Sequence, residues 1–592
     1  MLSALVYGAK RGLGGRQSRS RKLVVLLKQA KEAGEISALV EKAPMDPFVA
    51  STAMSQLRRL GKSAEALLLF ERTLAEGCEQ NVFTFSAAIS ACAQTRRWQK
   101  ALELFEEMQR RGLETSVITF SATMSACVKS GQWEKALEVF EDMRELHEPT
   151  VVTYTSAISA CDKGRQWRKA LFFFCELQDR GLEPSLITYN ATISACANCG
   201  RLEEALELFG QMQEQGLEPD ALTYTATISA CGKAGQWEHA LEVFSLLKRK
   251  KSLAPTVSTY NATISACGKG GQWEKALELF RQMQRNLEPD VVTYNATISA
   301  CERAGQWQKA LELFGQLQRQ GGSEPTVITF NATISACEKG HQWEAALKIF
   351  GQMQQSGLEP TVVTYAATIS ACGKSKRWEQ ALEVFHMLQK SRLEPTVITY
   401  NAIISACLKG GQWDKAMELF GQMRAAGLEP DAITYSDMIS ACESANRFEE
   451  ARALFLEAHA KGLFPKIQRV EGTLVLKELS APVARTALRM ALDDLRREPE
   501  HRECYKSPLL GDFIRDHGYF IVNTGSGVRN GGGTSVLRPA ILALLQGDYE
   551  QIRYEQYLHR PDLLIVQAPS FAGEPLQQPP PSKVAELTYY IK

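Results

Sequence analysis

A stretch of about 35 residues recurs along most of this 592-residue chain, and this repetition constrains the fold more than any other feature. Eleven clear copies begin at Val82, Val117, Val151, Leu186, Ala221, Val257, Val291, Val327, Val362, Val397 and Ala432. A twelfth, weaker copy occupies residues 47–81. Repeats of this length are typical of solenoids, in which each unit packs against its neighbours.

Apolar residues within each copy follow two helical stripes. In the copy at 257–290, Tyr260, Ile264 and Cys267 are spaced i, i+4, i+7, and a second helical run extends from Trp273 to Met283. One helix pair cannot bury its apolar face alone, so neighbouring pairs must stack. The predicted fold class is therefore mostly α: an α-solenoid of about twelve two-helix repeats in a right-handed superhelix, followed by a small α/β domain. We expect function on the concave face.

Charge is unevenly distributed. The formal net charge is +1, but residues 1–31 hold eight basic residues and no acid, so the remainder is mildly acidic. Bulk charge therefore does not favour nucleic acid, and any phosphate contact must be local. The basic, serine-containing composition of residues 1–31 predicts an organellar transit peptide, with a disordered basic tail as the alternative. Residues 32–46 are predicted to form a lead-in helix, and no apolar run is long enough to span a membrane.

The cysteines indicate packing rather than metal or disulfide chemistry. Eleven of the fifteen occupy one repeat position: Cys92, Cys127, Cys161, Cys196, Cys231, Cys267, Cys301, Cys337, Cys372, Cys407 and Cys442. We predict small buried hydrophobes in a reducing compartment. Cys196 and Cys199 form a CxxC pair without the second pair that a zinc site needs. No metal and no cofactor is expected.

Two further registers carry aromatic and basic side chains. All nine tryptophans begin the second helix of a repeat, where packing between repeats is favoured over base stacking. A cation ends the first helix in eight of the eleven clear copies: Lys129, Lys163, Lys233, Lys269, Arg303, Lys339, Lys374 and Lys409. One cation per repeat is a pattern that suits a sugar-phosphate backbone. The alternative is simple compensation of the helix dipole.

Small polar residues vary at two positions while their surroundings are nearly constant. The fifth residues of the copies are Ser51, Ser86, Ser121, Thr155, Asn190, Thr225, Asn261, Asn295, Asn331, Ala366, Asn401 and Ser436. The last residues are Asn81, Ser116, Thr150, Ser185, Asp220, Thr256, Asp290, Thr326, Thr361, Thr396, Asp431 and Lys466. Such a pattern suits the selection of bases one at a time. Helix capping and turn formation explain Ser, Thr and Asn equally well.

These copies, with the common form VTYNATISACGKGGQWEKALELFGQMQxxGLEPD, closely resemble the pentatricopeptide repeat family over residues 47–466. The resemblance implies single-stranded RNA binding in plastids or mitochondria, about one nucleotide per repeat, with the fifth and last residues selecting the base. It implies uracil at Asn190/Asp220, Asn261/Asp290 and Asn401/Asp431, and adenine at Ser51/Asn81. Ala366 and the many Ser or Thr last residues depart from the family's best-defined pairs.

The same resemblance implies that the second residue of a repeat inserts between bases. The residues concerned are Ile118, Val152, Ile187, Val292, Ile328, Val363, Ile398 and Ile433. Related tetratricopeptide repeats bind peptides, but their tryptophan landmark lies in the first helix, whereas here tryptophan opens the second.

The repeat period stops after Lys466. Strands are predicted at 473–476, 519–523, 552–557 and 563–567, and helices at 481–496 and 536–545, giving an α/β domain at 467–571 and a loosely ordered tail at 572–592. A glycine-rich loop with Gly525, Gly527, Arg529 and Ser535 lies between a strand and a helix, a place that suits an anion or RNA, with a flexible loop as the alternative. This segment resembles the small MutS-related (Smr) domain, yet it has Val-Leu-Lys-Glu at 475–478 where nucleolytic members have Asp-Leu-His-Gly.

The sequence thus predicts a sequence-selective single-stranded RNA-binding protein of a mitochondrion or chloroplast that supports RNA processing, stability or translation. Other RNA-processing proteins are further candidate partners, and no membrane is involved. No catalytic residue is assigned. An RNA endonuclease directed by the repeats and a peptide-binding scaffold are the alternatives.

Overall fold

The computed structural model describes residues 47–75, 80–250, 252–320, 324–464, 473–476, 479–497, 519–524, 537–549, 552–556 and 563–567. The predicted transit peptide, the lead-in helix and the tail lie outside the described residues, as do Gly525, Gly527, Arg529 and Ser535 of the glycine-rich loop. The chain forms two compact units, Met1–Ala304 with Gly315–Ser323, and Gly305–Phe314 with Glu324–Lys592.

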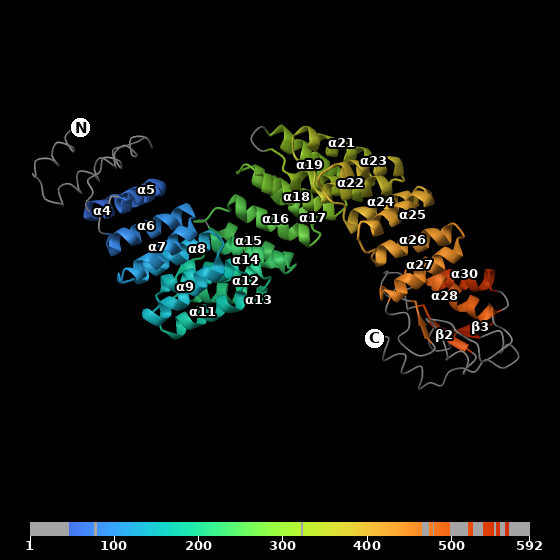
Figure 1. Cartoon of the computed structure of the whole chain (residues 1–592), viewed down its shortest axis with the longest axis horizontal. Helices are drawn as coiled ribbons and strands as arrows, with labels where there is room; N and C mark the ends of the chain where they lie inside the picture. Colours follow the sequence, from blue (N-terminus) through green and yellow to red (C-terminus); the bar gives the residue numbers. More distant parts are fainter. Residues whose placement is uncertain are drawn as a thin grey trace, which may run out of the picture. The chain divides into compact units, whose positions relative to one another are not determined.

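Helix pairs build the first unit, and Figure 1 shows them in sequence order. The first helix of each pair is called the A helix and the second the B helix. The A helices are α4 (Pro47–Arg59), α6 (Val82–Thr95), α8 (Val117–Lys129), α10 (Val151–Lys163), α12 (Leu186–Asn198), α14 (Ala221–Lys233), α16 (Val257–Lys269) and α18 (Val291–Arg303). The B helices are α5 (Ser63–Ala75), α7 (Trp98–Arg110), α9 (Trp133–Leu146), α11 (Trp167–Asp179), α13 (Leu202–Glu214), α15 (Trp237–Arg249) and α17 (Trp273–Gln284).

The second unit continues the same pattern. Its A helices are α20 (Val327–Lys339), α22 (Val362–Lys374), α24 (Val397–Lys409) and α26 (Ala432–Ser444). Its B helices are α21 (Trp343–Gln355), α23 (Trp378–Lys390), α25 (Trp413–Ala425) and α27 (Phe448–Ala460). Helix α19 (Trp307–Arg319) lies at the boundary of the two units. Every A helix begins at a predicted copy start, so the predicted solenoid of two-helix repeats is confirmed.

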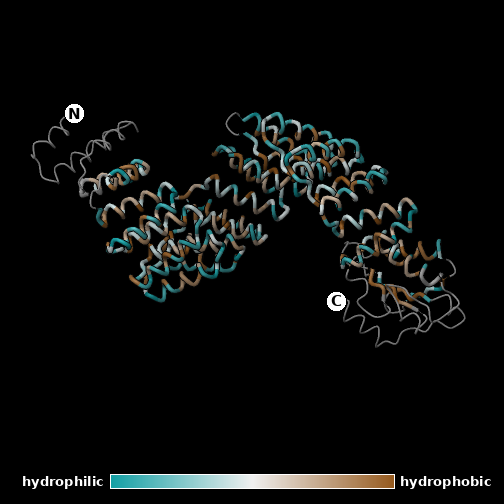
Figure 2. The backbone as a smooth tube through the Cα atoms, in the orientation of Figure 1, coloured by the Kyte–Doolittle hydropathy of each residue, from teal (hydrophilic) through white to brown (hydrophobic). Residues whose placement is uncertain are grey.

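Each repeat helix buries one side and exposes the other, and Figure 2 shows hydrophobic and hydrophilic residues along the same helices. Within each unit, consecutive A helices pack on one another and each B helix packs on the next A helix. Aromatic rings meet edge-to-face at this second contact: Phe244 of α15 and Tyr260 of α16 have ring centroids 5.0 Å apart, and Phe385 and Tyr400 repeat the contact at 5.2 Å. Aromatic pairs of this geometry stabilise by about 0.5–1.5 kcal/mol beyond their buried area.

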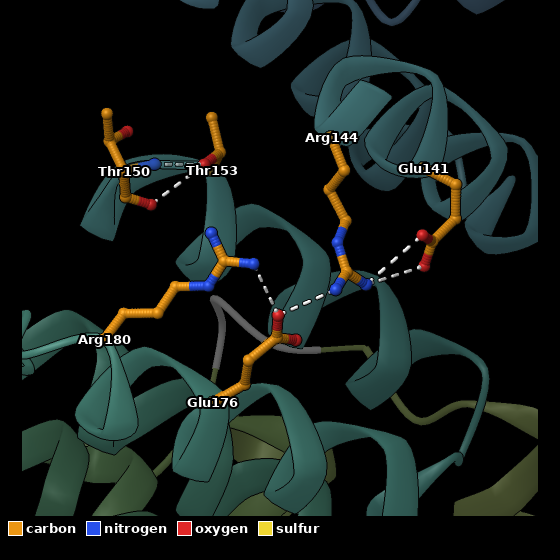
Figure 3. A network of polar contacts seen from close by, with 6 residues as sticks. All are labelled: Glu141, Arg144, Thr150, Thr153, Glu176 and Arg180. Carbon is orange, nitrogen blue, oxygen red and sulfur yellow. Dashed lines mark hydrogen bonds and ion pairs between the residues drawn. The ribbon is translucent and has the colours of Figure 1, made fainter. Parts of the chain in front are cut away.

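Ion pairs also join neighbouring repeats. In Figure 3, Arg144 of α9 reaches Glu176 of α11 at 2.7 Å, and Arg180 adds a second contact to the same carboxylate at 3.1 Å. Glu141 approaches Arg144 from its own helix at 3.2 Å. The side chain of Glu176 is only 15% exposed, so this bridge is less screened by solvent than the surface pairs of single helices.

A small α/β segment follows the last repeat in the second unit. Its four strands are β1 (Thr473–Val475), β2 (Tyr519–Asn523), β3 (Tyr554–Gln556) and β4 (Leu563–Gln567), in the sheet order β1-β2-β4-β3. Strand β2 pairs parallel with β1 and antiparallel with β4, and β3 pairs antiparallel with β4. Helices α28 (Ala481–Arg497) and α30 (Leu537–Gly547) also lie in the described part of this segment. The predicted elements are all present, although β3 is shorter than predicted.

Helix α28 packs against α26 and α27, the last repeat. Thr486 of α28 donates a hydrogen bond of 2.8 Å to Glu443, whose carboxylate is buried and also lies near Arg485 and Arg489. The guanidinium of Arg489 stacks over the ring of Phe448 at 3.8 Å. The α/β segment is therefore attached to the end of the repeats through a buried charged contact.

Candidate nucleic-acid interface

Three registers share one face of every A helix. The second, fifth and thirteenth residues of a repeat fall within one helical stripe because they are separated by three and eight positions. Tyr or Phe at the fourth position and the repeat cysteine at the eleventh point instead into the core. Packing A helices side by side within a unit therefore places one residue of the fifth register on a common face for each helix and adds, in most repeats, one apolar residue and one cation.

The last residue of each repeat caps the next A helix. Asp220, for example, accepts a hydrogen bond of 2.8 Å from the backbone N–H of Thr223, while its own N–H donates to the Thr223 hydroxyl at 3.1 Å. In Figure 3, the N–H of Thr150 donates to the Thr153 hydroxyl, and this hydroxyl donates to the carbonyl of Thr150. The same capping box precedes every A helix from α6 to α26 for which the structure describes both residues. The predicted capping role is thus present.

The fifth and last residues of one repeat also touch each other, as base selection by a pair requires. Nδ2 of Asn190 donates to Asp220 at 3.2 Å, and Nδ2 of Asn261 donates to Asp290 at 3.2 Å. Asn401 and Asp431 repeat this contact at 3.1 Å. Capping and pairing are therefore compatible, because one carboxylate performs both.

The carboxylates of these pairs are acceptors at neutral pH. Burial raises the pKa of Asp220. Hydrogen bonds from the backbone N–H and hydroxyl of Thr223 and from the amide of Asn190 together lower it by more, so the net pKa lies below the usual Asp value. Asp290 and Asp431 show the same balance and the same net direction. An ionised carboxylate accepts hydrogen bonds and donates none, so it fixes the direction of every contact it makes.

Repeats with Ser, Thr or Ala at the fifth position differ. The hydroxyls of Ser86, Ser121 and Thr225 donate to the carbonyl four residues earlier in their own helix, at 2.6–2.7 Å. Thr155 does the same and also contacts the Thr188 hydroxyl at 2.8 Å. Ala366 is buried and offers no polar group. Direct contact between the fifth and last residues is therefore observed in the repeats with Asn190, Asn261, Asn331 and Asn401. The side chain of Ser51 and residue Lys466 lie outside the described residues.

An exposed apolar side chain stands at the second position of most repeats. The eight residues predicted from the sequence, Ile118, Val152, Ile187, Val292, Ile328, Val363, Ile398 and Ile433, are 58–71% exposed. Phe83 and Leu222 occupy the same register and are 74% and 63% exposed, although only Val and Ile were expected at this position. Branched apolar residues exposed at constant pitch mark a contact surface.

The cations at the end of the A helices are all exposed. Lys233 donates to Asn198 of the preceding repeat at 2.5 Å, and Lys374 pairs with Glu338 of the preceding repeat at 3.1 Å. Partial burial and the neighbouring cation Lys269 lower the pKa of Lys233, so successive members of the row are close enough to interact. Exposure and a common sign favour anion contact, while the position in the last helical turn also complements the dipole.

The tryptophans pack between repeats as predicted, but they are half-buried rather than buried. Four of the rings, those of Trp133, Trp237, Trp307 and Trp378, cover a glycine in the turn of the next repeat: a Cβ built on Gly270 would lie 2.2 Å from Cδ1 of Trp237. The next repeat also supplies a cation over several rings, such as Lys275 over Trp237 at 4.1 Å and Lys415 over Trp378 at 3.8 Å. These faces are therefore used for packing between repeats.

The repeat cysteines are buried and free, which confirms their predicted packing role. Burial raises the pKa of the Cys161 and Cys337 thiols to about 12, and that of Cys267 to about 11. Among the described residues no cluster of three or more His, Cys, Asp or Glu side chains is placed to hold a metal ion. No helix in the described part of the chain is both long and apolar enough to cross a membrane.

The fold and the interface define the chain as a helical-repeat protein in which neighbouring A helices present the same three registers on one face. Models of the pentatricopeptide repeat match it throughout this region. The PPR repeat family model matches residues 149–198, 184–233, 255–301, 289–339, 325–374, 360–409 and 395–444, the pentatricopeptide repeat domain model matches 68–130 and 103–163, and the PPR repeat model matches 222–252 and 433–463. Together they cover more than half of the chain, which therefore belongs to the pentatricopeptide repeat family.

Several solved structures are similar to the chain. The pentatricopeptide repeat protein PPR10 from maize is 22% identical with a TM-score of 0.41, over 78% of this chain and 86% of that one. PPR10 in complex with an 18-nt psaJ RNA element is 21% identical with a TM-score of 0.38, over 82% and 83%. Yeast Rmd9p with a 16-nt target RNA is 11% identical with a TM-score of 0.35, over 75% and 96%. A search of curated protein sequences gives no match.

Proposed function

We propose that this protein binds single-stranded RNA in a sequence-selective manner, about one nucleotide per repeat, through the common face of the A helices. The observation that carries the proposal is the contact between the fifth and last residues of the repeats with Asn190, Asn261 and Asn401. In two of these repeats the second residue, Ile187 or Ile398, is an exposed apolar side chain. A polar pair of fixed direction beside an exposed apolar side chain supplies the two elements that base recognition needs, hydrogen bonds to the base edge and a surface to stack on.

Uracil is the base that best fits the Asn/Asp pairs. Its Watson–Crick edge presents the N3–H donor between two carbonyl acceptors. The carboxylate of Asp431 accepts only, and the second hydrogen of Asn401 Nδ2 is a donor, so the pair complements this arrangement. Cytosine has an acceptor at N3, which an ionised carboxylate repels. The uracil preference that the family resemblance implies thus has a physical basis in the pair.

The row of cations at the thirteenth position is proposed to contact phosphates. Because the chain carries a net charge of only +1, affinity for RNA should depend on these local charges rather than on bulk attraction. We also propose that the protein acts in an organelle, on the basis of the basic composition of residues 1–31. A fluorescent protein carrying residues 1–31 should enter mitochondria or chloroplasts, and a cytosolic distribution would contradict organellar targeting by these residues.

Binding of the full-length protein to labelled random single-stranded RNA, duplex RNA and a random peptide pool tests the RNA proposal at several salt concentrations. We expect single-stranded RNA to bind most tightly. Lys269→Gln should flatten the dependence of log K on log salt by about 0.7, the change for one lost phosphate contact. Lys275→Gln is the matched control, since this side chain covers the Trp237 ring. Peptide binding without RNA binding would favour the scaffold alternative.

A further inference from the structure

The sixth residue of the last repeat departs from the pattern of the array. This residue is alanine in nine of the eleven clear copies and Ser156 in a tenth, but it is Asp437 in the copy that begins at Ala432. Asp437 is half-buried on the side of α26 that faces α24, where its carboxyl group forms a hydrogen bond with Ser405. A carboxyl group thus stands between two A helices at a register where the other clear copies have a methyl or hydroxymethyl group.

The two A helices at this junction, α24 and α26, pack less closely than α22 and α24 do. Between α22 and α24 small residues meet, and a Cβ on Gly373 would lie 2.7 Å from the Cβ of Ala406. The residues at the same two registers of α24 and α26 are Leu408 and Ala441. Both of them line a cavity of about 390 Å³ that opens between the two helices.

This cavity is lined by two charged side chains, three serines and several apolar side chains. Asp437 of α26 and Lys409 at the end of α24 supply the charges, and the positive charge of Lys409 acts on the carboxyl group. The serines are Ser405, Ser440 and Ser444, and the apolar residues are Leu408, Trp413, Ala441 and Ala445. A volume of this size, with apolar walls and a few polar groups, is typical of a site for a small ligand.

The carboxyl group of Asp437 is placed to accept N–H donors. Burial raises its pKa, and the neighbouring carboxylate of Asp431 acts in the same direction. The hydrogen bond with Ser405 and the charge of Lys409 lower the pKa, but the net pKa stays above the usual Asp value. The ionised group is therefore stabilised less in the cavity than in water, and a ligand with two neighbouring N–H groups would supply the missing stabilisation.

Guanine is the base whose edges match these two charges. Its N1–H and 2-amino groups are neighbouring donors, which a carboxylate accepts in a bidentate contact. Its O6 and N7 atoms are neighbouring acceptors, to which lysine and arginine side chains donate. Adenine and cytosine place an acceptor beside the amino group, and uracil places its N–H between two acceptors, so each would set an acceptor against the carboxylate. A guanidinium group would satisfy Asp437 but would be repelled by Lys409.

We propose that the cavity between α24 and α26 binds a guanine base, with Asp437 accepting N1–H and the 2-amino group, Lys409 donating to O6 and N7, and Trp413 contacting the ring. The base belongs to a free nucleotide or to a guanine of bound single-stranded RNA, since both present the same edges. The first case is independent of the proposed function, and the second rests on it. In the second case this guanine is additional to the nucleotides assigned to the repeats, because the described lining residues do not include Asn401, Asp431 or Ser436.

Titration calorimetry of the full-length protein with GMP, IMP and AMP tests for the free nucleotide. IMP lacks only the 2-amino group, so it removes one of the two hydrogen bonds to Asp437. We expect GMP to bind at least about tenfold more tightly than IMP, the usual effect of one hydrogen bond to a charged group. AMP should bind more weakly still, because it presents an acceptor to the carboxylate.

Two variants of Asp437 test the assignment of the carboxylate. Asp437→Ala restores the residue of most other repeats, and Asp437→Asn keeps the shape of the side chain but loses one acceptor and the charge. Both should reduce the affinity for GMP at least about tenfold. Asp414→Ala is the matched control: Asp414 is an acid on α25 that is not among the lining residues, so the affinity should be unchanged. Circular dichroism should show the same helix content in all three variants.

Selection from a random single-stranded RNA pool by the native protein and by Asp437→Ala tests for a guanine of RNA. A guanine that the native protein enriches and Asp437→Ala loses, while the rest of the motif remains, would assign the cavity to RNA. Equal affinity for GMP and IMP, or an unchanged GMP affinity in Asp437→Ala, would overturn the inference. The lack of both GMP binding and a guanine that depends on Asp437 would overturn it as well. GMP binding through Asp437 without any enriched RNA motif would contradict the proposed function and leave this inference standing.

Discussion

Asn401 and Asp431, thirty residues apart in sequence, are joined by hydrogen bonds from Nδ2 of the asparagine to both oxygens of the aspartate, at 3.1 and 3.2 Å. The same carboxylate accepts the backbone N–H groups of Ile433 and Thr434 and thereby begins helix α26. One side chain therefore serves both the stability of the repeat stack and the proposed choice of base. A substitution of Asp431 therefore has to be tested both for the stability of the protein and for the base that it selects.

Replacing this pair should change one base of the target. Asn401→Ser with Asp431→Asn produces the combination found at Ser51 and Asn81, for which adenine is expected. Asn81 caps α6 through Thr84 at 3.0 Å, so asparagine is an adequate cap and the melting temperature should change little. Sequencing of selected RNA should show U replaced by A at one position only. A shift at several positions, or at none, would disprove independent selection by single repeats.

The exposed second residues should matter for RNA and not for folding. Ile398 is 70% exposed, so Ile398→Ala should alter the free energy of unfolding by less than about 0.5 kcal/mol. Its affinity for single-stranded RNA should fall severalfold, since the apolar contact to the bases is lost. Ile404 of the same helix is fully buried, and Ile404→Ala should instead cost about 2–5 kcal/mol of stability. Equal RNA affinity of Ile398→Ala and the native protein would rule out base contact at this register.

The turn glycines beneath the tryptophans should resist substitution. A Cβ at Gly410 would lie 2.4 Å from Cδ1 of Trp378, so Gly410→Ala should destabilise the protein by about 1–3 kcal/mol through displacement of the ring. A Cβ at Gly421, within helix α25, would meet no neighbouring atom within 4 Å. Gly421→Ala should therefore stabilise by about 0.5–1 kcal/mol. Denaturant unfolding of the two variants checks the sign of each effect.

The repeat cysteines should be inert in the folded protein. Ten of them are buried with pKa values raised to about 11 or 12 by burial, so at pH 8 they are both inaccessible and protonated. Among the cysteines in the described part of the chain, Cys175 is the exposed one and should react with iodoacetamide first. Peptide mass spectrometry after brief labelling measures this order. Rapid labelling of Cys267 or Cys337 in the native protein would contradict the packing described above.

Much of the fold is predictable from the sequence because each repeat has the same pattern of capping and apolar residues. The copy starts at Val82, Val257 and Val397 are the first residues of helices in the structure, since the last residue of the preceding repeat is a cap and the following stripe is apolar. The half-buried tryptophans were harder to place. For four of them the environment includes a glycine of the next repeat, which the pattern of a single repeat does not include.

The interface was predictable in its residues but not in its contacts. The fifth and last positions are visible in the sequence as variable polar residues. The third-position threonines are nearly the same in every repeat, so their pattern predicts no role in base selection. In the structure Thr223 and Thr434 contact the asparagine of the preceding repeat at 2.6 and 2.5 Å. Such a contact involves two successive A helices, so it follows from their packing rather than from the pattern of one helix.

The central claim is sequence-selective RNA binding by the repeats, and selection from a random single-stranded RNA pool tests it most directly. The three Asn/Asp pairs belong to the fourth, sixth and tenth clear copies. We therefore predict an enriched motif with one U, a second U two nucleotides along and a third four nucleotides beyond that. A motif without this spacing of uracils, or no enrichment at a salt concentration near the physiological value, would contradict the account.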